Sequence, residues 1–184
     1  MSCAESTSAR PLLALLLVLA GCGGMGNDLF PSGADQRPPV VPGTVGPAVG
    51  QVAPDFTVRG VDGAPVSLYS VLASAPGAVL YFTMWCPICD AHMSDMQVNA
   101  IPAHPDVPFF ALDYVSGSVE AARSAQLGSG WGTTSFTVLA DVGATVEGFY
   151  QAPMAVVVVD RDHVVRMNGE YTWPRLQAVL GALP

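Results

Sequence analysis

The sequence predicts an α/β domain of three layers, with helices on both faces of a mixed central sheet. Two observations support this: segments with strand-like apolar runs alternate with segments that have helical patterns, and their order is βαβ followed by ββα. The 184-residue chain is long enough to bury one sizeable core. We expect the domain to occupy residues 51–184 and to open with a β-hairpin extension.

Apolar runs and turn signals locate the elements of this domain. Asp62-Gly63 is a hairpin-turn pair between expected strands at 55–61 and 64–68. Five further apolar runs have strand length, and we expect strands at 78–83, 107–113, 135–140, 155–160 and 164–168. Helices are expected between them, at 68–73, 87–99, 118–126 and 144–150, and in a last segment capped by Thr172 and ended at Gly181.

The segment Trp85-Cys86-Pro87-Ile88-Cys89 is the most informative part of the chain. Two cysteines separated by two residues can form and open a disulfide without moving the rest of the fold. Pro87 suits the first position of a helix, where the missing N–H costs nothing, so Cys86 is expected at the helix N-terminus. The helix dipole there favours a thiolate by about 0.3–1 kcal/mol. Cys89, one turn further along, is expected to face inward.

Two other interpretations of the cysteine pair are weaker. A structural disulfide closing so short a ring would stabilise the fold by only about 2 kcal/mol. A zinc site lacks a second pair of ligands, because His92, His104 and His163 are scattered. The pattern therefore favours redox exchange by Cys86 and Cys89, with no metal and no cofactor.

The N-terminus has the pattern of a secretory signal peptide. A single basic residue, Arg10, precedes an apolar stretch at 11–20 that is too short to span a bilayer. The following Leu19-Ala20-Gly21-Cys22 resembles the lipobox of bacterial lipoproteins. That resemblance implies cleavage after residue 21, acyl chains on Cys22, and a membrane-anchored lipoprotein on the extracytoplasmic side, periplasmic in a Gram-negative cell. A signal peptide without lipidation remains the alternative.

Composition limits the partners of the protein. Residues 23–50 are rich in Gly and Pro, so we expect residues 22–50 to form a lipidated, flexible tether. With Cys3 removed and Cys22 lipidated, the two cysteines of the motif remain and no disulfide framework is expected. The net charge is −8 and the seven basic residues form no cluster, which excludes nucleic acid as a partner.

Residues 51–184 resemble the thioredoxin-like superfamily, in particular its extracytoplasmic, membrane-tethered thiol-disulfide oxidoreductases of the redoxin type. Beside the cysteine motif, the matching residues are Ala53-Pro54-Asp55-Phe56, Asp62-Gly63, Val66-Ser67-Leu68, Ala152-Pro153 before the 156–159 run, and Asp160-Arg161-Asp162. The resemblance implies a thioredoxin-like fold and exchange of dithiol for disulfide with a protein substrate, in a reductive branch of cytochrome or oxidase assembly. It also implies a membrane-side redox partner, and we expect a monomer.

The resemblance assigns roles to individual residues. Cys86 would attack a substrate disulfide, Cys89 would resolve the mixed disulfide, and Trp85 would shield one side of the sulfurs. Pro153 would be a cis-proline that shapes the docking groove, with the backbone of Ala152 pairing with an extended substrate. The expected substrate-binding residues are Trp85, Pro87, Ala152 and Pro153.

The chain departs from the family pattern in two places. Leu80 stands where thioredoxins usually have a buried acid, so the proton acceptor for Cys89 is open. Asp113 is one candidate, because it ends an expected strand, and an exposed loop carboxylate is the alternative. The interval from Pro153 to Asp160 is one residue longer than is common in the family.

Two other functions remain as alternatives. Thr83-Met84-Trp85-Cys86 reproduces the Thr-x-x-Cys half of a peroxiredoxin motif, although Val79 replaces its proline. A non-enzymatic copper protein would hold Cu(I) with both cysteines and His92 or His163. Methionines also surround the motif, but at these spacings they are more typical of core packing than of metal binding: Met84, Met93 and Met96.

Overall fold

The computed structural model describes residues 39–184, and one compact unit runs from Val40 to Pro184. The expected signal peptide, Cys22 and most of the expected tether lie outside the described residues. The last residues of the expected tether hydrogen bond with the domain: the Gly50 N–H donates to the Val165 carbonyl at 2.9 Å. The compact unit therefore begins before Gln51. Within residues 39–184, no helix has the length and hydropathy needed to cross a bilayer.

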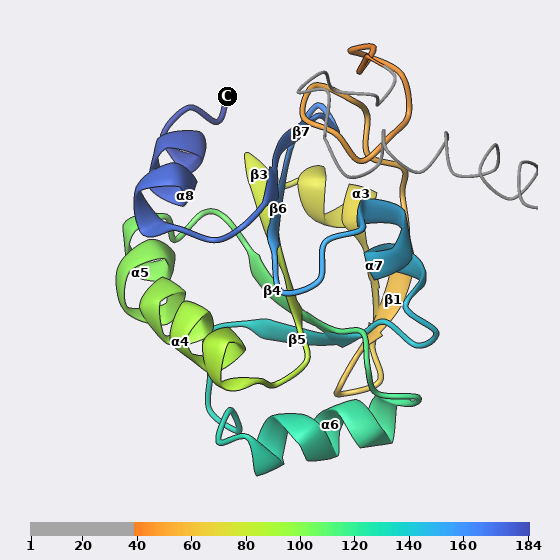
Figure 1. Cartoon of the computed structure of the whole chain (residues 1–184), viewed down its shortest axis with the longest axis vertical. Helices are drawn as coiled ribbons and strands as arrows, with labels where there is room; N and C mark the ends of the chain where they lie inside the picture. The colour runs from red at the N-terminus through yellow and green to blue at the C-terminus, as the bar shows by residue number, and fades with distance from the viewer. Residues whose placement is uncertain (1–38) are drawn as a thin grey trace, which may run out of the picture. The chain divides into compact units, whose positions relative to one another are not determined.

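A seven-stranded mixed sheet forms the centre of the domain, with strand order β2-β1-β5-β4-β3-β6-β7 (Figure 1). Its strands are β1 (Thr57–Gly60), β2 (Pro65–Ser67), β3 (Gly77–Thr83), β4 (Phe109–Asp113), β5 (Thr137–Ala140), β6 (Val156–Asp160) and β7 (Val165–Gly169). The pairs β3–β4 and β4–β5 are parallel, and the other pairs are antiparallel. The expected mixed sheet and the N-terminal hairpin β1–β2 are both confirmed.

Helices cover both faces of this sheet (Figure 1). They are α3 (Leu68–Leu72), α4 (Pro87–Asp95), a π-helical turn η2 (Met96–Ala100), α5 (Ile101–Ala103), α6 (Val119–Gly128), α7 (Thr145–Tyr150) and α8 (Trp173–Leu180). The fully buried strand β3 alternates between two cores: Tyr81 packs with Met93 of α4, whereas Leu80 and Phe82 pack with Leu72 of α3. This alternation of side chains produces the predicted three layers.

The helix after the cysteine motif is longer and less regular than the sequence predicts. We expected one helix ending at Asn99, whereas α4 continues through the π turn η2 into α5. In that turn the Ile101 N–H bonds to the Met96 carbonyl, five residues back. Pro102 has no N–H to donate, so a regular helical ladder cannot pass through it.

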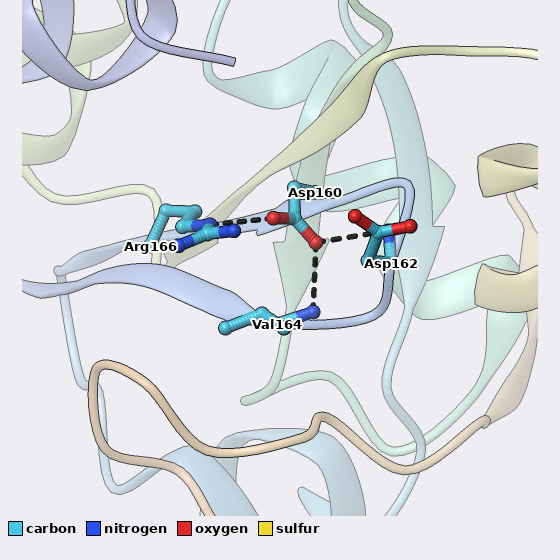
Figure 2. Close-up of polar contacts among 4 residues, drawn as sticks. All are labelled: Asp160, Asp162, Val164 and Arg166. Carbon is cyan, nitrogen blue, oxygen red and sulfur yellow. Dashed lines mark hydrogen bonds and ion pairs between the residues drawn. The ribbon is translucent and has the colours of Figure 1, made fainter. Parts of the chain in front are cut away.

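The hairpin between β6 and β7 is held by a buried carboxylate (Figure 2). Asp160 is fully buried, and its Oδ1 accepts from the backbone N–H groups of Asp162 at 3.0 Å and Val164 at 2.8 Å. Its Oδ2 accepts from Nε of Arg166. Because local donors already occupy both oxygens, the Asp160-Arg161-Asp162 segment is a structural part of the turn.

Candidate redox site

Cys86 and Cys89 form a disulfide at the N-terminus of α4, with their Cα atoms 5.0 Å apart. Cys86 is the N-cap, with extended backbone, and Pro87 is exposed at the first helical position. The Cys89 N–H donates to Sγ of Cys86 at 3.2 Å, and the Asp90 N–H donates to the Cys86 carbonyl at 2.9 Å. The motif therefore lies where strand β3 leads into a helix, as predicted, and one N–H of the first helical turn, that of Cys89, faces the sulfur of Cys86.

The two cysteines differ in exposure. Cys89 has no exposed surface and packs in the core with Tyr81 and Met93. Cys86 lies at the edge of that core and is only partly buried. A substrate sulfur can therefore reach Cys86 from solvent, while Cys89 presents no surface to it.

Trp85 is held beside the disulfide by two polar contacts. Its backbone is left-handed, with φ of 57°, and its N–H donates to Oγ1 of Thr83 at 3.1 Å. Its indole Nε1 donates to Oδ2 of the fully buried Asp113 at 2.7 Å. The same carboxylate accepts from the N–H groups of Val115 and Ser116 and from the Ser116 hydroxyl. Asp113 thus positions Trp85, and its role as proton acceptor for Cys89 stays a prediction.

A cavity of about 320 Å³ opens beside Cys86. Trp85, Thr83 and Asp90 line it together with Trp131 of the loop after α6. Nε1 of Trp131 donates to Oδ1 of Asp90 at 2.8 Å, which ties that loop to the first turn of α4. A larger surface cavity, about 560 Å³, lies by β2 and α3 and contains no cysteine. Trp131 could not be predicted from the sequence, because no local pattern links it to a residue 41 positions away.

The segment around Pro153 differs from the expectation. No peptide bond in residues 39–184 is cis, so the prediction of a cis-proline was wrong. The Ala155 N–H donates to the Ala152 carbonyl at 3.1 Å and closes a tight turn. Pro153 occupies the second position of that turn and Met154, with φ of 56°, the third, which is a pattern that suits a trans proline. Ala152 is buried at 2% exposure, and its pairing with substrate stays a prediction.

Met154 is the residue that this turn brings to the disulfide. Its Sδ lies 3.6 Å from Sγ of Cys86, and 37% of the residue is exposed. One feature of the sequence is consistent with this turn: the interval from Pro153 to Asp160 is one residue longer than is common in the family that the chain resembles. It did not show which side chain the longer turn would present.

The histidines named for a copper site have other partners. Nδ1 of His92 lies 3.1 Å from the Tyr81 hydroxyl, and the His163 ring stacks on Tyr69 with centroids 3.6 Å apart. Burial lowers the pKa of His92, against an opposing effect of Asp95, and burial raises the pKa of Tyr81 well above its usual range. Within residues 39–184, no group of three or more His, Cys, Asp and Glu residues could hold a metal. The nearby Met93 and Met96 are fully buried and pack in the core.

A cysteine pair at the start of the helix that follows a central strand, in a mixed sheet covered on both faces, defines a thioredoxin-like redox protein. The family model described as the AhpC/TSA family matches residues 49–168. The chain therefore belongs to the AhpC/TSA family. No curated protein sequence matches it.

Solved structures share the fold. The dsbF protein of Mycobacterium tuberculosis, solved in mixed oxidized and reduced forms, is 25% identical over 70% of this chain and 95% of its own, with a TM-score of 0.58. A secreted disulfide oxidoreductase of the same organism, homologous to Escherichia coli DsbE, is 26% identical over 70% and 96%, with a TM-score of 0.53. A thioredoxin-like protein from Aeropyrum pernix is 18% identical over 70% and 89%, with a TM-score of 0.57.

Proposed function

We propose that this protein is an extracytoplasmic thiol-disulfide oxidoreductase that exchanges electrons with protein substrates through Cys86 and Cys89. The observation that carries the proposal is the asymmetry of the pair: Cys86 is reachable at a helix N-terminus, and Cys89 is fully buried behind it. Similar proteins include a secreted disulfide oxidoreductase, which supports both the activity and the compartment.

The reaction follows from this geometry. In the reduced protein the Cys86 thiolate attacks a substrate disulfide, forms a mixed disulfide and releases one substrate thiolate. The Cys89 thiolate then attacks Sγ of Cys86, releases the second substrate thiolate and forms the disulfide found in the structure. A dithiol partner at the membrane returns both cysteines to thiols by the same two steps. The Cys89 N–H at 3.2 Å and the helix dipole favour the Cys86 thiolate as attacking and leaving group.

A tethered location is part of the proposal. The apolar stretch at 11–20 and the lipobox-like Leu19-Ala20-Gly21-Cys22 support secretion and lipidation at Cys22. Labelling cells with a radioactive fatty acid tests the anchor: the chain should incorporate label, and Cys22→Ser should not. If the wild-type chain incorporates no label, the result would support the alternative, a signal peptide that is cleaved without lipidation.

Trapping experiments test the roles of the two cysteines. The full chain with Cys3→Ser and Cys22→Ser leaves Cys86 and Cys89 as its thiols. In that background Cys89→Ala should accumulate mixed disulfides with substrate proteins, because the attack on Cys86 is removed. Cys86→Ala should lose turnover and trap nothing, because Cys89 has no exposed surface. Trapping by Cys86→Ala would contradict the assigned order of attack.

The reduction potential decides the direction of electron flow. Equilibration of the same chain in dithiothreitol or glutathione buffers, followed by thiol trapping, measures it. We propose a reductive role in cytochrome or oxidase assembly, for which a potential near that of thioredoxin, about −270 mV, is expected. A value near −120 mV would instead identify a disulfide donor.

A peroxidase activity is the second candidate, because Thr83 and Cys86 line the same cavity. Oγ1 of Thr83 accepts from the Trp85 N–H, and its O–H would be the donor that orients a peroxide. The Cys86 thiolate would attack the O–O bond to give a sulfenic acid and water, and Cys89 would condense with it to form the disulfide and a second water. Peroxide consumption far above that of free thiols, and lost in Thr83→Val, would support this candidate.

A further inference from the structure

We propose that the reduced protein binds one Cu(I) ion through three sulfur atoms, those of Cys86, Cys89 and Met154. The histidines first considered as third ligands are engaged with Tyr81 and Tyr69, whereas Met154 already contacts Cys86. Cu(I) binding would thus be distinct from disulfide exchange. Its ligand is a metal ion, and it depends on Met154, which disulfide exchange does not require.

The distances fit a three-coordinate site. Metal–thiolate bonds are about 2.3 Å long, so sulfurs at the corners of a trigonal site lie roughly 4 Å from one another. Sδ of Met154 lies 3.6 Å from Sγ of Cys86. Sγ of Cys86 is bonded to Sγ of Cys89, so all three sulfurs lie close together. Reduction opens that bond and lets the two Sγ atoms move apart, which is the movement that a trigonal site with Met154 requires.

The backbone holds the thioether in this place. Met154 has φ of 56°, in the left-handed region that an unbranched non-glycine residue rarely adopts. The turn that imposes this φ is closed by the Ala155 N–H bond to the Ala152 carbonyl. Trp85, next to Cys86, also has a positive φ, of 57°. Backbone strain of this kind is often found at functional sites. Two of the five left-handed non-glycine residues in 39–184, Trp85 and Met154, lie on the segments that supply the sulfurs.

The donor set selects the metal. Thiolate and thioether ligands suit Cu(I), whereas Zn²⁺ takes four ligands from nitrogen, thiolate and carboxylate groups. No group of three or more His, Cys, Asp and Glu residues within 39–184 could supply those. Two thiolates and one neutral thioether give the Cu(I) complex a charge of −1, which the N-terminus of α4 favours. Binding releases the protons still carried by the two thiols.

Access and reduction state complete the site. Met154 is 37% exposed and Cys86 is partly buried, so a Cu(I) donor can reach these two sulfurs from solvent. The ion would bond to the buried Cys89 after it has bound to them. The disulfide form cannot bind, because neither cysteine then carries a thiolate. When a substrate disulfide accepts two electrons from the pair and leaves as two thiols, the Cys86–Cys89 disulfide forms and the ion is released; a dithiol that is itself oxidised to a disulfide restores the site.

An anaerobic titration with Cu(I) tests the proposal. The full chain with Cys3→Ser and Cys22→Ser, reduced with dithiothreitol and desalted, competes with a chromophoric Cu(I) chelator at pH 7. Met154→Leu keeps the apolar volume and removes the sulfur. The matched control is Met84→Leu, which removes an equally exposed thioether two residues before Cys86. We expect 1:1 binding that Met154→Leu weakens by at least about tenfold, a loss seen when residues supporting a metal are removed. Met84→Leu should bind like the parent chain.

X-ray absorption at the copper edge provides the second readout. The parent chain and Met84→Leu should show three sulfur neighbours, and Met154→Leu should show two. Equal affinity and equal sulfur number in the parent chain and Met154→Leu would overturn the proposal, as would weak binding by the parent chain. Reduction of a protein disulfide is measured on the same preparations, so that loss of redox exchange and loss of Cu(I) binding are scored separately.

Discussion

Replacing Asp113 with Asn should have two effects that can be measured separately, one on the stability of the fold and one on the geometry of the redox site. Asp113 is fully buried, and Oδ2 accepts from Nε1 of Trp85 and from the Ser116 hydroxyl, both at 2.7 Å. An amide has one oxygen, which can keep the bonds from the N–H groups of Val115 and Ser116. Its NH₂ group then faces the indole N–H, and two donors cannot pair. Trp85 therefore loses its acceptor.

The expected cost follows from that lost bond. A hydrogen bond to a charged group, or a buried donor left without a partner, is worth about 1–3 kcal/mol. For a domain of this size, 1 kcal/mol shifts Tm by about 4 °C, so Asp113→Asn should lower Tm by roughly 4–12 °C. Calorimetry of the oxidised protein measures this shift.

The kinetic effect should depend on substrate size. Trp85 lines the cavity beside Cys86, so its displacement should slow exchange with a folded protein disulfide by a few-fold to about 100-fold. Exchange with a small aromatic disulfide needs no such docking and should stay unchanged. Asp160→Asn is the matched control: it also alters a fully buried carboxylate at a strand end, but the residue holds the β6–β7 hairpin and should affect stability alone. Equal slowing with both substrates, or no slowing in Asp113→Asn, would refute the positioning of Trp85 by Asp113.

Three further predictions concern stability. Asp141→Ala should lower the free energy of unfolding by about 1–2 kcal/mol in urea titrations. The Asp141 carboxylate accepts from the N–H groups of Thr145, Val146 and Glu147 at the start of α7, and alanine cannot replace these bonds. An unchanged urea midpoint would contradict this capping. Pro153→Ala should cost about 0.4–1 kcal/mol, because the unfolded chain gains freedom while the turn keeps its geometry; a gain in stability would contradict the trans turn. His92 has a lowered pKa in the fold, so the unfolded chain binds its proton more readily and stability should fall as pH decreases below about 6.5. His92→Gln should flatten that slope between pH 7.5 and 5.5, and an equally steep slope in the variant would assign the effect to other groups.

Local signals were sufficient to predict most of the elements. Asp62-Gly63 fixed the β1–β2 turn, the apolar run at 78–83 fixed β3, and Pro87 fixed the start of α4. Cys89 could be placed in the core from helical spacing, since the residue one turn after an N-cap cysteine faces the sheet. In each case the physical cause is within a few residues of its effect.

The contacts that shape the site could not be predicted in this way. The bond between Trp85 and Asp113 joins residues 28 positions apart, and it depends on the parallel register that places Thr83 opposite Asp113 in β3 and β4. The bond between Trp131 and Asp90 depends on the path of a loop. Register and loop path follow from the packing of the whole sheet, so a single sequence carries no local signal for them.

The turn at Pro153 changes what a substrate meets beside Cys86. In the expected arrangement the backbone of Ala152 would be open to pair with an extended peptide. In the structure Ala152 is buried and its carbonyl already accepts from the Ala155 N–H, while the thioether of Met154 faces the disulfide. The carbonyl that was expected to pair with a substrate thus has a partner within the turn, and a side chain, that of Met154, lies next to Cys86. Selectivity for substrates should therefore depend more on the shape and polarisability of the group that approaches Cys86 than on the pairing of an extended strand. The Met154 thioether beside Cys86 also makes a soft metal ion a suitable occupant of the reduced site.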